Sequence, residues 1–166
     1  MMETILFVLA MLGIALLQGV SYGPALASAS IAVLLAAAAL AFRLRGNGAR
    51  ARELGMKAAA FAVLVGALFA LKTINRGIAA RGTEQLTSAC EAYKSRTGSY
   101  PASLDLLVPG EISSLPRAGL SLSWGRYLLR DGRIFHVTEP GLMAGSYDLA
   151  GKSWKSVRFS EMFPGY

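Results

Sequence analysis

The sequence predicts a membrane protein in which three apolar helices anchor a small α+β domain, built from one long helix and an antiparallel sheet. Three features predict this fold class: a charge-free apolar stretch at residues 4–42, another apolar segment at 58–71, and strand-like patterns after Pro116. We therefore divide the chain into a transmembrane region at 1–75 and an extracytoplasmic α+β domain at 76–166.

Residues 4–42 contain no Asp, Glu, Lys, Arg or His, a composition that hydrocarbon requires and that soluble surface helices do not tolerate. A membrane span needs about 20 residues, so this stretch is long enough for two spans. Turn-forming residues at 21–24 divide it, which predicts spans at about 4–21 and 24–42. A signal peptide is the alternative for the first span. The N-terminus lacks the basic residues of such peptides, so an uncleaved helix is favoured.

The third apolar segment, Ala58–Leu71, is flanked by Lys57 and Lys72, whose ammonium groups can reach the two membrane interfaces. It predicts a third span at about 57–75. Five basic residues against one acidic residue lie between the second apolar stretch and this one: Arg43, Arg45, Arg50, Arg52 and Lys57 against Glu53. The positive-inside bias places this loop and the N-terminus in the cytoplasm, and the domain after about Asn75 outside.

Small residues recur every four positions in the predicted spans, and such stripes let helix backbones approach closely. The candidate helix-packing residues are Gly19, Ala58, Ala62, Gly66 and Ala70. The alternative, that Ala and Gly are simply frequent in membrane helices, carries equal weight. Gln18 is the one strongly polar side chain deep in a span, and we expect a neighbouring helix or a partner subunit to bind its amide.

The third span is predicted to continue past Thr73 as an amphipathic helix, with a bend at Gly82. Its inward residues are expected to be Ile78, Leu86, Ala89, Cys90 and Tyr93. The helix should end at Gly98, because glycine suits the left-handed position after a helix and Tyr100-Pro101 prevents continuation. A short helix is predicted at about 102–108.

Strand patterns follow Pro116, where Leu120, Leu122 and Trp124 alternate with serines and predict the first strand. The dipeptide Asp131-Gly132 lies between two apolar runs and predicts a β-hairpin with a type I′ turn. A second hairpin is predicted around Ala150-Gly151. In it, Tyr147 and Trp154 could pair across the strands.

The sequence offers no recognisable catalytic chemistry. His136 is the only histidine and is expected at a half-buried or surface position, and Cys90, the only cysteine, is expected to be a small buried apolar residue. The ten carboxylates are scattered, and no phosphate-binding loop or dinucleotide fingerprint is present. We therefore predict no enzyme, no cofactor, no catalytic or metal residues and no small-molecule substrate. The hairpin arginines are expected to be solvated, which argues against nucleic-acid binding.

One family resemblance rests on an apolar helix that continues as an amphipathic one, followed by a short motif and a small sheet. The motif residues are Ala92–Lys94, Gly98–Leu107 and Leu115–Pro116. This arrangement resembles the type IV pilin superfamily, and most of all the major pseudopilins of type II secretion. The resemblance implies that Gly98, Tyr100, Pro101 and Leu104 frame the domain. It also implies that Trp124, Tyr127 and Phe135 cover the helix from the sheet side.

The resemblance further implies a location in the bacterial inner membrane, with the domain in the periplasm. The sequence departs from the pilins in two ways. Gly55–Lys57 stands near the usual processing site, but no acidic residue follows within the span and two apolar helices precede it, so ordinary pilin processing and polymerisation are not expected. The acidic residues of the pseudopilin calcium site also have no match in residues 139–148.

Two functions compete on these observations. The first is a non-catalytic accessory or structural subunit, which contacts membrane lipid and other membrane subunits in a secretion, pilus or respiratory complex. The second is a periplasmic sensor or ligand-binding membrane protein, but its cytoplasmic side would hold only a short basic loop and the N-terminus. The first function is favoured, because the sequence shows no output domain.

Overall fold

The computed structural model describes residues 2–18 and 22–163. In chain order the elements are α1 (Met2–Gln18), α2 (Tyr22–Leu44), α3 (Gly48–Thr97), η1 (Leu104–Leu107), β1 (Tyr127–Arg130), β2 (Arg133–Glu139), β3 (Met143–Asp148), β4 (Ser153–Arg158) and α4 (Phe159–Met162). They form two compact units, unit 1 at Met1–Lys72 and unit 2 at Thr73–Tyr166. Helix α3 contributes its first half to unit 1 and its second half to unit 2.

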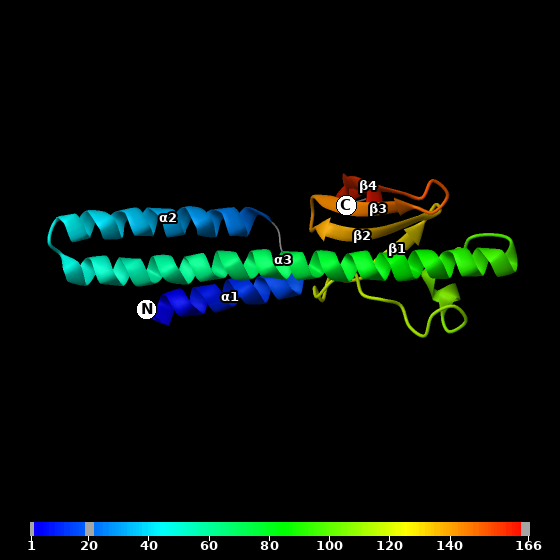
Figure 1. Ribbon diagram of the computed structural model, residues 1–166, viewed down its shortest axis with the longest axis horizontal. Coiled ribbons are helices and arrows are strands. Elements are labelled where there is room, and N and C mark those ends of the chain that lie inside the picture. The colour runs from blue at the N-terminus through cyan, green and yellow to red at the C-terminus, as the bar shows by residue number, and fades with distance from the viewer. Residues whose placement is uncertain (1, 19–21, 164–166) are drawn as a thin grey trace. The chain divides into compact units, whose positions relative to one another are not determined.

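Unit 1 consists of α1, α2 and the first half of α3 (Figure 1). Apolar side chains from the three helices form one cluster, in which Leu64 and Leu68 of α3 are completely or almost completely buried. Many large apolar side chains point outward instead: Leu6, Leu9, Ile14, Leu26, Val33, Leu34, Leu40 and Val63. Apolar side chains around the outside of a helical unit are typical of helices that face lipid.

Two helices in the described part of the chain are long and apolar enough to cross a membrane, and they contain Ala25–Leu44 and Gly48–Thr97. These correspond to the second and third predicted spans. The first predicted span is not matched, because the apolar helix found among the described residues there, Leu6–Ala15, is shorter than a span requires. At 1.5 Å per residue, the 17 residues of α1 extend about 26 Å, which is less than the hydrocarbon core of a typical bilayer. Residues 19–21 lie outside the described part.

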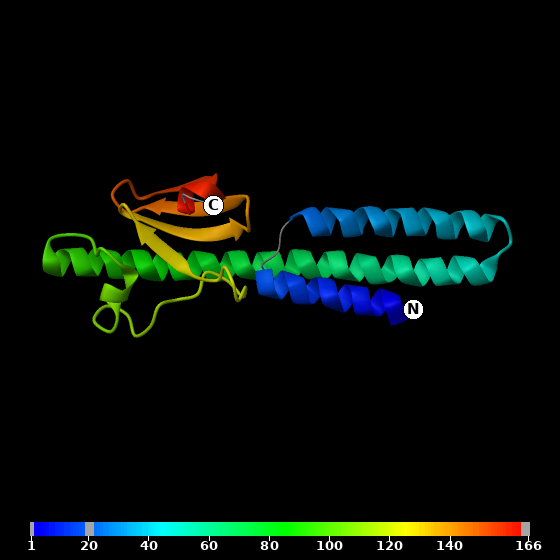
Figure 2. The ribbon, with the colours of Figure 1, turned by 180° about the vertical axis from the view of Figure 1, so that it is seen from behind.

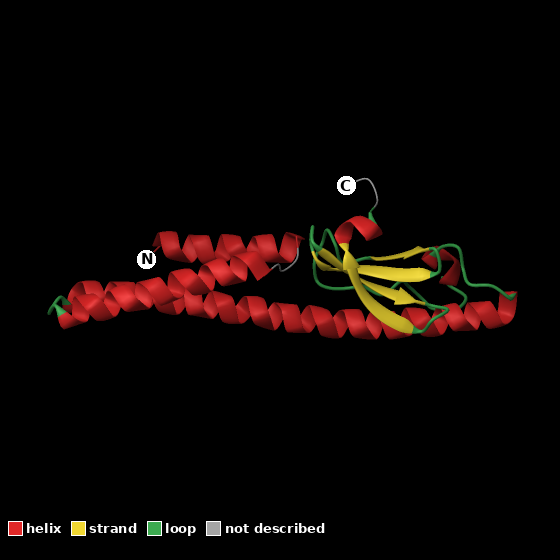
Figure 3. Cartoon of the chain, turned by 90° about the horizontal axis from the view of Figure 1, so that it is seen from above, coloured by secondary structure: helices red, strands yellow, loops and turns green. Residues whose placement is uncertain are grey.

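Unit 2 contains a four-stranded antiparallel sheet in which the strands follow chain order, β1-β2-β3-β4. The sheet lies along one side of the second half of α3, and the segment between α3 and β1 lies along the other side (Figures 1 and 2). Figure 3 shows the same strands from above. The predicted long helix and antiparallel sheet are thus both present.

Both predicted hairpins are confirmed. Asp131 and Gly132 have φ values of 50° and 69°, the positive values that a type I′ turn requires. In the second hairpin Tyr147 pairs with Trp154, and their ring centroids lie 5.4 Å apart. The backbone N–H groups of Ala150 and Gly151 donate to the Asp148 carboxylate and lower the pKa of this group.

Helix α3 ends as predicted. Gly98 has a φ of 84°, and its N–H donates to the carbonyl of Lys94 at 2.8 Å. The predicted short helix is a 3₁₀-helix, η1, which buries Leu104 and Leu107 against α3 residues in the core. The Tyr100 hydroxyl lies 3.0 Å from both a Glu91 carboxylate oxygen and the carbonyl oxygen of Leu149. This contact ties the returning chain to the helix and to the sheet.

The main core of unit 2 lies between α3, η1 and one face of the sheet. Its buried members are Leu86, Ala89, Cys90, Leu104, Leu107, Ile112, Ile134 and Leu149. Leu86, Ala89 and Cys90 are three of the five inward residues predicted from the helical pattern, and Cys90 is fully buried as expected. The other two, Ile78 and Tyr93, are half-buried. Burial and, to a smaller extent, the neighbouring Glu91 raise the pKa of the Cys90 thiol to about 11, so the thiol is unreactive at neutral pH.

Two expectations for the sheet are wrong. Residues 120–124 form a turn instead of the first strand, and β1 begins only at Tyr127. Phe135 also faces away from α3 and packs with Ala144 and Met162, because successive side chains of a strand point to opposite faces and Ile134 faces the core. Trp124 lies against the ring of Phe159, at 5.2 Å between centroids.

Gly82 lies within the helix α3, and its surroundings explain the glycine without a bend. A Cβ atom at this position would lie 2.5 Å from the Tyr127 hydroxyl and 3.1 Å from the carbonyl oxygen of Arg117. Only glycine therefore lets the side chain of Tyr127 and the segment before β1 approach the helix this closely.

Candidate functional site

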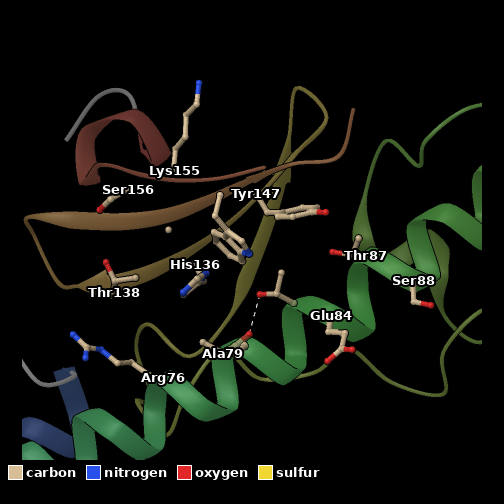
Figure 4. A pocket seen from close by; sticks show the side chains of 14 residues that line it. Arg76, Ala79, Glu84, Thr87, Ser88, His136, Thr138, Tyr147, Lys155 and Ser156 are labelled. Carbon is tan, nitrogen blue, oxygen red and sulfur yellow. Dashed lines mark hydrogen bonds between the residues drawn. The ribbon is translucent and has the colours of Figure 1, made fainter. Parts of the chain in front are cut away.

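A groove of about 730 Å³ lies within unit 2, between the second half of α3 and the sheet (Figure 4). The helix contributes mainly small residues, and strands β2, β3 and β4 contribute the opposite wall. The helical wall consists of Arg76, Ala79, Ala80, Thr83, Glu84, Thr87 and Ser88. The sheet wall consists of His136, Thr138, Gly145, Tyr147, Trp154, Lys155 and Ser156.

The sheet wall carries a row of rings that contact one another edge to face or at a tilt. The ring centroids of Tyr127 and His136 lie 5.8 Å apart, those of His136 and Trp154 lie 5.3 Å apart, and Trp154 contacts Tyr147 in turn. Edge-to-face contacts of this kind contribute about 0.5–1.5 kcal/mol beyond the area that they bury. The rings therefore form a firm, largely apolar surface.

Gly145 makes this surface possible. It is the cross-strand partner of His136, and a Cβ at this position would lie 2.5 Å from His136 Cε1 and 3.0 Å from an indole carbon of Trp154. The absence of a side chain allows both rings to lie across the strand backbone. A glycine inside a strand is typical of such close approach.

His136 is the basic side chain in this aromatic row, and it is only 8% exposed. Its Nδ1 atom is buried without a hydrogen-bond partner. Burial lowers the pKa of the imidazole to about 4, so the ring is neutral at physiological pH. The expectation of a half-buried or surface histidine is therefore wrong, because β2 turns this residue toward α3.

The remaining polar groups of the helical wall are mostly satisfied locally. The Tyr127 hydroxyl donates to the carbonyl of Ala79 at 2.7 Å, and the Thr83 hydroxyl donates to the same oxygen at 2.8 Å. Charged side chains are confined to the rim, where Arg76, Glu84 and Lys155 are exposed. A neutral imidazole on an apolar floor suits the binding of a planar apolar molecule that carries one hydrogen-bonding group.

The described part of the chain contains no group of three or more His, Cys, Asp or Glu side chains that could hold a metal ion. Within the groove, His136 and Glu84 are the titratable residues besides the rim cations and Tyr147. Among the residues that the structure describes, no hydrogen bond or ion pair joins His136 to a carboxylate that could orient it, an arrangement that acid–base catalysis commonly uses.

The four domain-framing residues lie together at the end of α3. Gly98 terminates the helix, Tyr100 bonds to Glu91 and to the sheet, Pro101 is buried, and Leu104 enters the core. None of them lines the groove. Their role is to hold the fold.

The predicted helix-packing residues behave differently from one another. Ala58 is buried within unit 1, whereas Ala62, Gly66 and Ala70 are exposed. A four-residue step advances about 40° around a helix of 3.6 residues per turn, so the stripe turns away from the buried face of α3. Gly19 and the side chain of Gln18 lie outside the described part of the structure.

Sequence reasoning missed the groove, because its walls come from α3 and three strands far apart in the chain. Two signals pointed toward it: a glycine inside a strand at position 145, and a histidine between apolar residues of β2. Neither residue type shows which residue lies opposite it. His136 and Gly145 meet only because of the register in which β2 and β3 pair.

Comparison of the chain with protein-family models, with curated proteins and with solved structures finds no match. The structure itself shows an α+β domain, and the long helix of this domain also belongs to an apolar helical unit. The likeness to pilins rests on the sequence motif.

Proposed function

We propose that the chain is a non-catalytic, membrane-anchored, pilin-like accessory subunit that docks into a larger membrane assembly, such as a secretion, pilus or respiratory complex. The supporting observation is the outer face of α3 in unit 1, where the small residues Ala62, Gly66 and Ala70 are exposed. A Cβ at Gly66 would meet no atom within 4 Å. Small residues spaced by four are the kind of surface that a second membrane helix packs against.

In this proposal α1 is a third span beside the two longer helices; the bilayer thins locally around this shorter helix, and the N-terminus lies in the cytoplasm. Its support is the distribution of side chains on α1: Leu12 and Ala15 face the cluster of unit 1, while Leu6 and Leu9 are exposed. The short connection between α2 and α3 and the adjoining helix ends carry the exposed arginines Arg43, Arg45, Arg50 and Arg52, which is typical of the cytoplasmic side of a membrane protein. Unit 2 then lies on the outer face of a bacterial inner membrane.

The pilin-like part of the proposal is supported by the path of the chain in unit 2. A long helix ends at a glycine, the chain returns along the helix through η1, and an antiparallel sheet then packs on it. Polymerisation as a pilin is not proposed, because no acidic residue follows Lys57 within the apolar segment of α3.

A helix-face substitution tests the docking role. Gly66→Leu places a bulky side chain on the small-residue face, and we expect the protein to leave a large complex on native sizing after gentle detergent extraction. Val63→Leu is the matched control, because Val63 is 71% exposed on the same helix and already bulky. Equal migration of both variants and of the wild-type chain at the size of a free subunit would contradict the proposal.

The groove supports a second candidate function, a ligand-binding membrane protein. The observation that favours it is the buried, neutral His136 on a floor of aromatic rings. A polar group left without a partner in such a place costs about 1–3 kcal/mol, and a ligand group that reaches Nδ1 and donates a hydrogen bond to it would restore part of this. The accessory role remains the first proposal, because the exposed small residues of α3 offer a surface for a second membrane helix.

An aromatic probe tests the second candidate. We expect 1-anilinonaphthalene-8-sulfonate to bind saturably at one site and to lose this binding in Ala80→Trp, where an indole would fill the groove. Ala102→Trp is the control, since Ala102 is exposed and lines no part of the groove. Probe binding that is unchanged by Ala80→Trp would argue against a ligand in the groove.

A further inference from the structure

The turn before β1 exposes the apolar residues that the sequence pattern assigns to the core. Leu120 and Leu122 are 40% and 64% exposed, whereas the serine between them is only 7% exposed. The Ser121 hydroxyl accepts a hydrogen bond from the N–H of Trp124 at 3.1 Å, and the N–H of Ala118 donates to the carbonyl of Gly125. These bonds close a tight turn, and the turn directs both leucines outward.

This turn is attached to α3 immediately after the apolar segment of the helix. The N–H of Leu120 donates to the Asn75 side-chain oxygen at 2.9 Å, and Gly119 lies against the same side chain. Asn75 follows Lys72, the residue that ends unit 1, by less than one helical turn. The exposed leucines therefore lie level with the point at which α3 leaves its apolar stretch.

The turn between β2 and β3 lies at the same end of unit 2. The strand register orders the sheet along α3: the pair His136–Gly145 lies near Ala79, whereas Leu149 lies at the other end, near Tyr100. Leu142 is beyond Gly145 on the Ala79 side, and it is 61% exposed. Figures 1 and 2 show this turn and the turn before β1 at the end where α3 enters unit 2.

Basic side chains accompany these leucines. Arg126 immediately precedes β1, and Arg158 pairs with Met143 next to the β2–β3 turn; both are exposed. Arg76 lies on α3 next to Asn75 and is also exposed. Two acidic residues lie at this end: Glu139, and Glu161, whose carboxylate accepts a hydrogen bond from the backbone N–H of Arg158 at 3.1 Å. Exposed apolar side chains with arginines around them are typical of surfaces that enter the interface of an anionic membrane.

We infer that this end of unit 2 is a lipid-binding surface, made of Leu120, Leu122 and Leu142 with Arg126 and Arg158. The leucines enter the bilayer interface and the guanidinium groups bind lipid phosphates. The inference rests on the proposed function in one respect, that α3 spans the membrane. It adds that unit 2 is seated on the lipid, which fixes the tilt of the groove and of the sheet relative to the membrane.

Site-specific quenching in vesicles tests this inference. The full chain is reconstituted into vesicles of phosphatidylcholine and phosphatidylglycerol, with an environment-sensitive fluorophore on a cysteine at Leu122→Cys or Leu142→Cys. Leu106→Cys, on the exposed side of η1, is the matched control in unit 2, and Val63→Cys reports on the span. The native Cys90 is fully buried and is not expected to react. Spin-labelled lipids then serve as the quencher.

We expect quenching at 122 and 142 to be several-fold stronger than at 106, and we expect it to fall when phosphatidylglycerol is omitted or when Arg126→Gln and Arg158→Gln are combined. Quenching at 122 and 142 no stronger than at 106, with strong quenching at 63, would overturn the inference and leave the membrane anchor intact. Labels that are shielded from water but unquenched by lipid would indicate a protein partner and would also overturn it. Absence of quenching at 63 would instead refute the anchor itself.

Discussion

Tyr127 is the side chain that joins the sheet most directly to α3. Its hydroxyl donates to the carbonyl of Ala79, lies 3.4 Å from the Thr83 hydroxyl, and fills the space that Gly82 leaves open. Burial raises the pKa of Tyr127, and the Thr83 hydrogen bond offsets part of this effect. Contacts at this one residue therefore set how closely the sheet approaches the helix.

Substitution of either partner should weaken unit 2. Tyr127→Phe removes one hydrogen bond and should lower the free energy of unfolding by about 1 kcal/mol. Gly82→Ala forces a Cβ against Tyr127 and a backbone oxygen, an overlap that typically costs about 1–3 kcal/mol. The higher helix propensity of alanine than of glycine offsets up to about 1 kcal/mol of this cost. Urea unfolding can be followed by tryptophan fluorescence, because both tryptophans lie in unit 2.

The double variant tests the contact itself. Without the hydroxyl, the added methyl group of Gly82→Ala meets less resistance, so the two losses should sum to more than the loss in the combined variant. Strictly additive losses would show that Gly82 and Tyr127 do not constrain one another.

His136 should make unit 2 sensitive to mild acid. Its folded-state pKa of about 4 lies below the ordinary value of 6.5, so the unfolded chain takes up a proton that the folded chain does not. The contribution of the neutral His136 to the free energy of unfolding is fully present above pH 6.5 and is lost as the pH falls toward about 4. Its magnitude is on the order of 3 kcal/mol.

The measurement is the urea midpoint of the detergent-solubilised chain as a function of pH. His136→Gln, which carries no titrating group, should flatten the curve between pH 6.5 and about 4. Asp148 also loses stabilising ionisation in acid, but its folded-state pKa is lowered from the ordinary value of 3.8, so most of its effect falls below this window. An unchanged slope in the glutamine variant would contradict the buried, neutral state of His136.

At the scale of elements, the C-terminal end of α3 depends on one backbone conformation. Gly98→Ala forces a residue with a Cβ into a φ of 84° and should destabilise unit 2 by about 1 kcal/mol. Gly110→Ala is the control, because its added Cβ would meet only the end of the Arg96 side chain at 3.8 Å. Equal unfolding midpoints for the two variants would show that the left-handed conformation is not required.

Elements with a local signal were predictable from sequence. Gly98, Asp131 and Gly132 adopt positive φ values. Glycine, and aspartate before glycine, favour such values, so these two turns can be predicted from the residue types alone. The inward residues of α3 followed from helical periodicity, because Leu86 and Cys90 recur on one face. These features depend on residues close together in the chain.

The turn at residues 120–124 shows where local signals fail. Leucines alternating with serines indicate a half-buried strand, but they cannot say which side of the segment meets the protein. The Asn75 side chain bonds to the N–H of Leu120, and the Ser121 hydroxyl bonds to the N–H of Trp124. As a result the serine is buried and the leucines on either side of it are exposed, the reverse of the predicted arrangement. The groove escaped prediction for the same reason, since His136, Gly145 and Trp154 meet only through strand register.

At the scale of the whole molecule, one helix belongs to two different environments. The 50 residues of α3 exceed the roughly 20 that a bilayer requires, so the same helix can serve as a span and as the spine of unit 2. Its first half shows exposed apolar side chains, and its second half alternates buried apolar with exposed charged ones. The proposed topology, with unit 2 outside, follows from the arginines before the span.

The most direct test of this topology is cysteine accessibility in intact cells. Ser99→Cys and Gly48→Cys each place an exposed thiol at one end of α3, and Cys90 remains silent because it is buried with a raised pKa. A membrane-impermeant maleimide should label position 99 from outside and should reach position 48 only after the membrane is permeabilised. Labelling of position 48 in intact cells, or of both positions alike, would contradict a helix that crosses the bilayer into an outer domain.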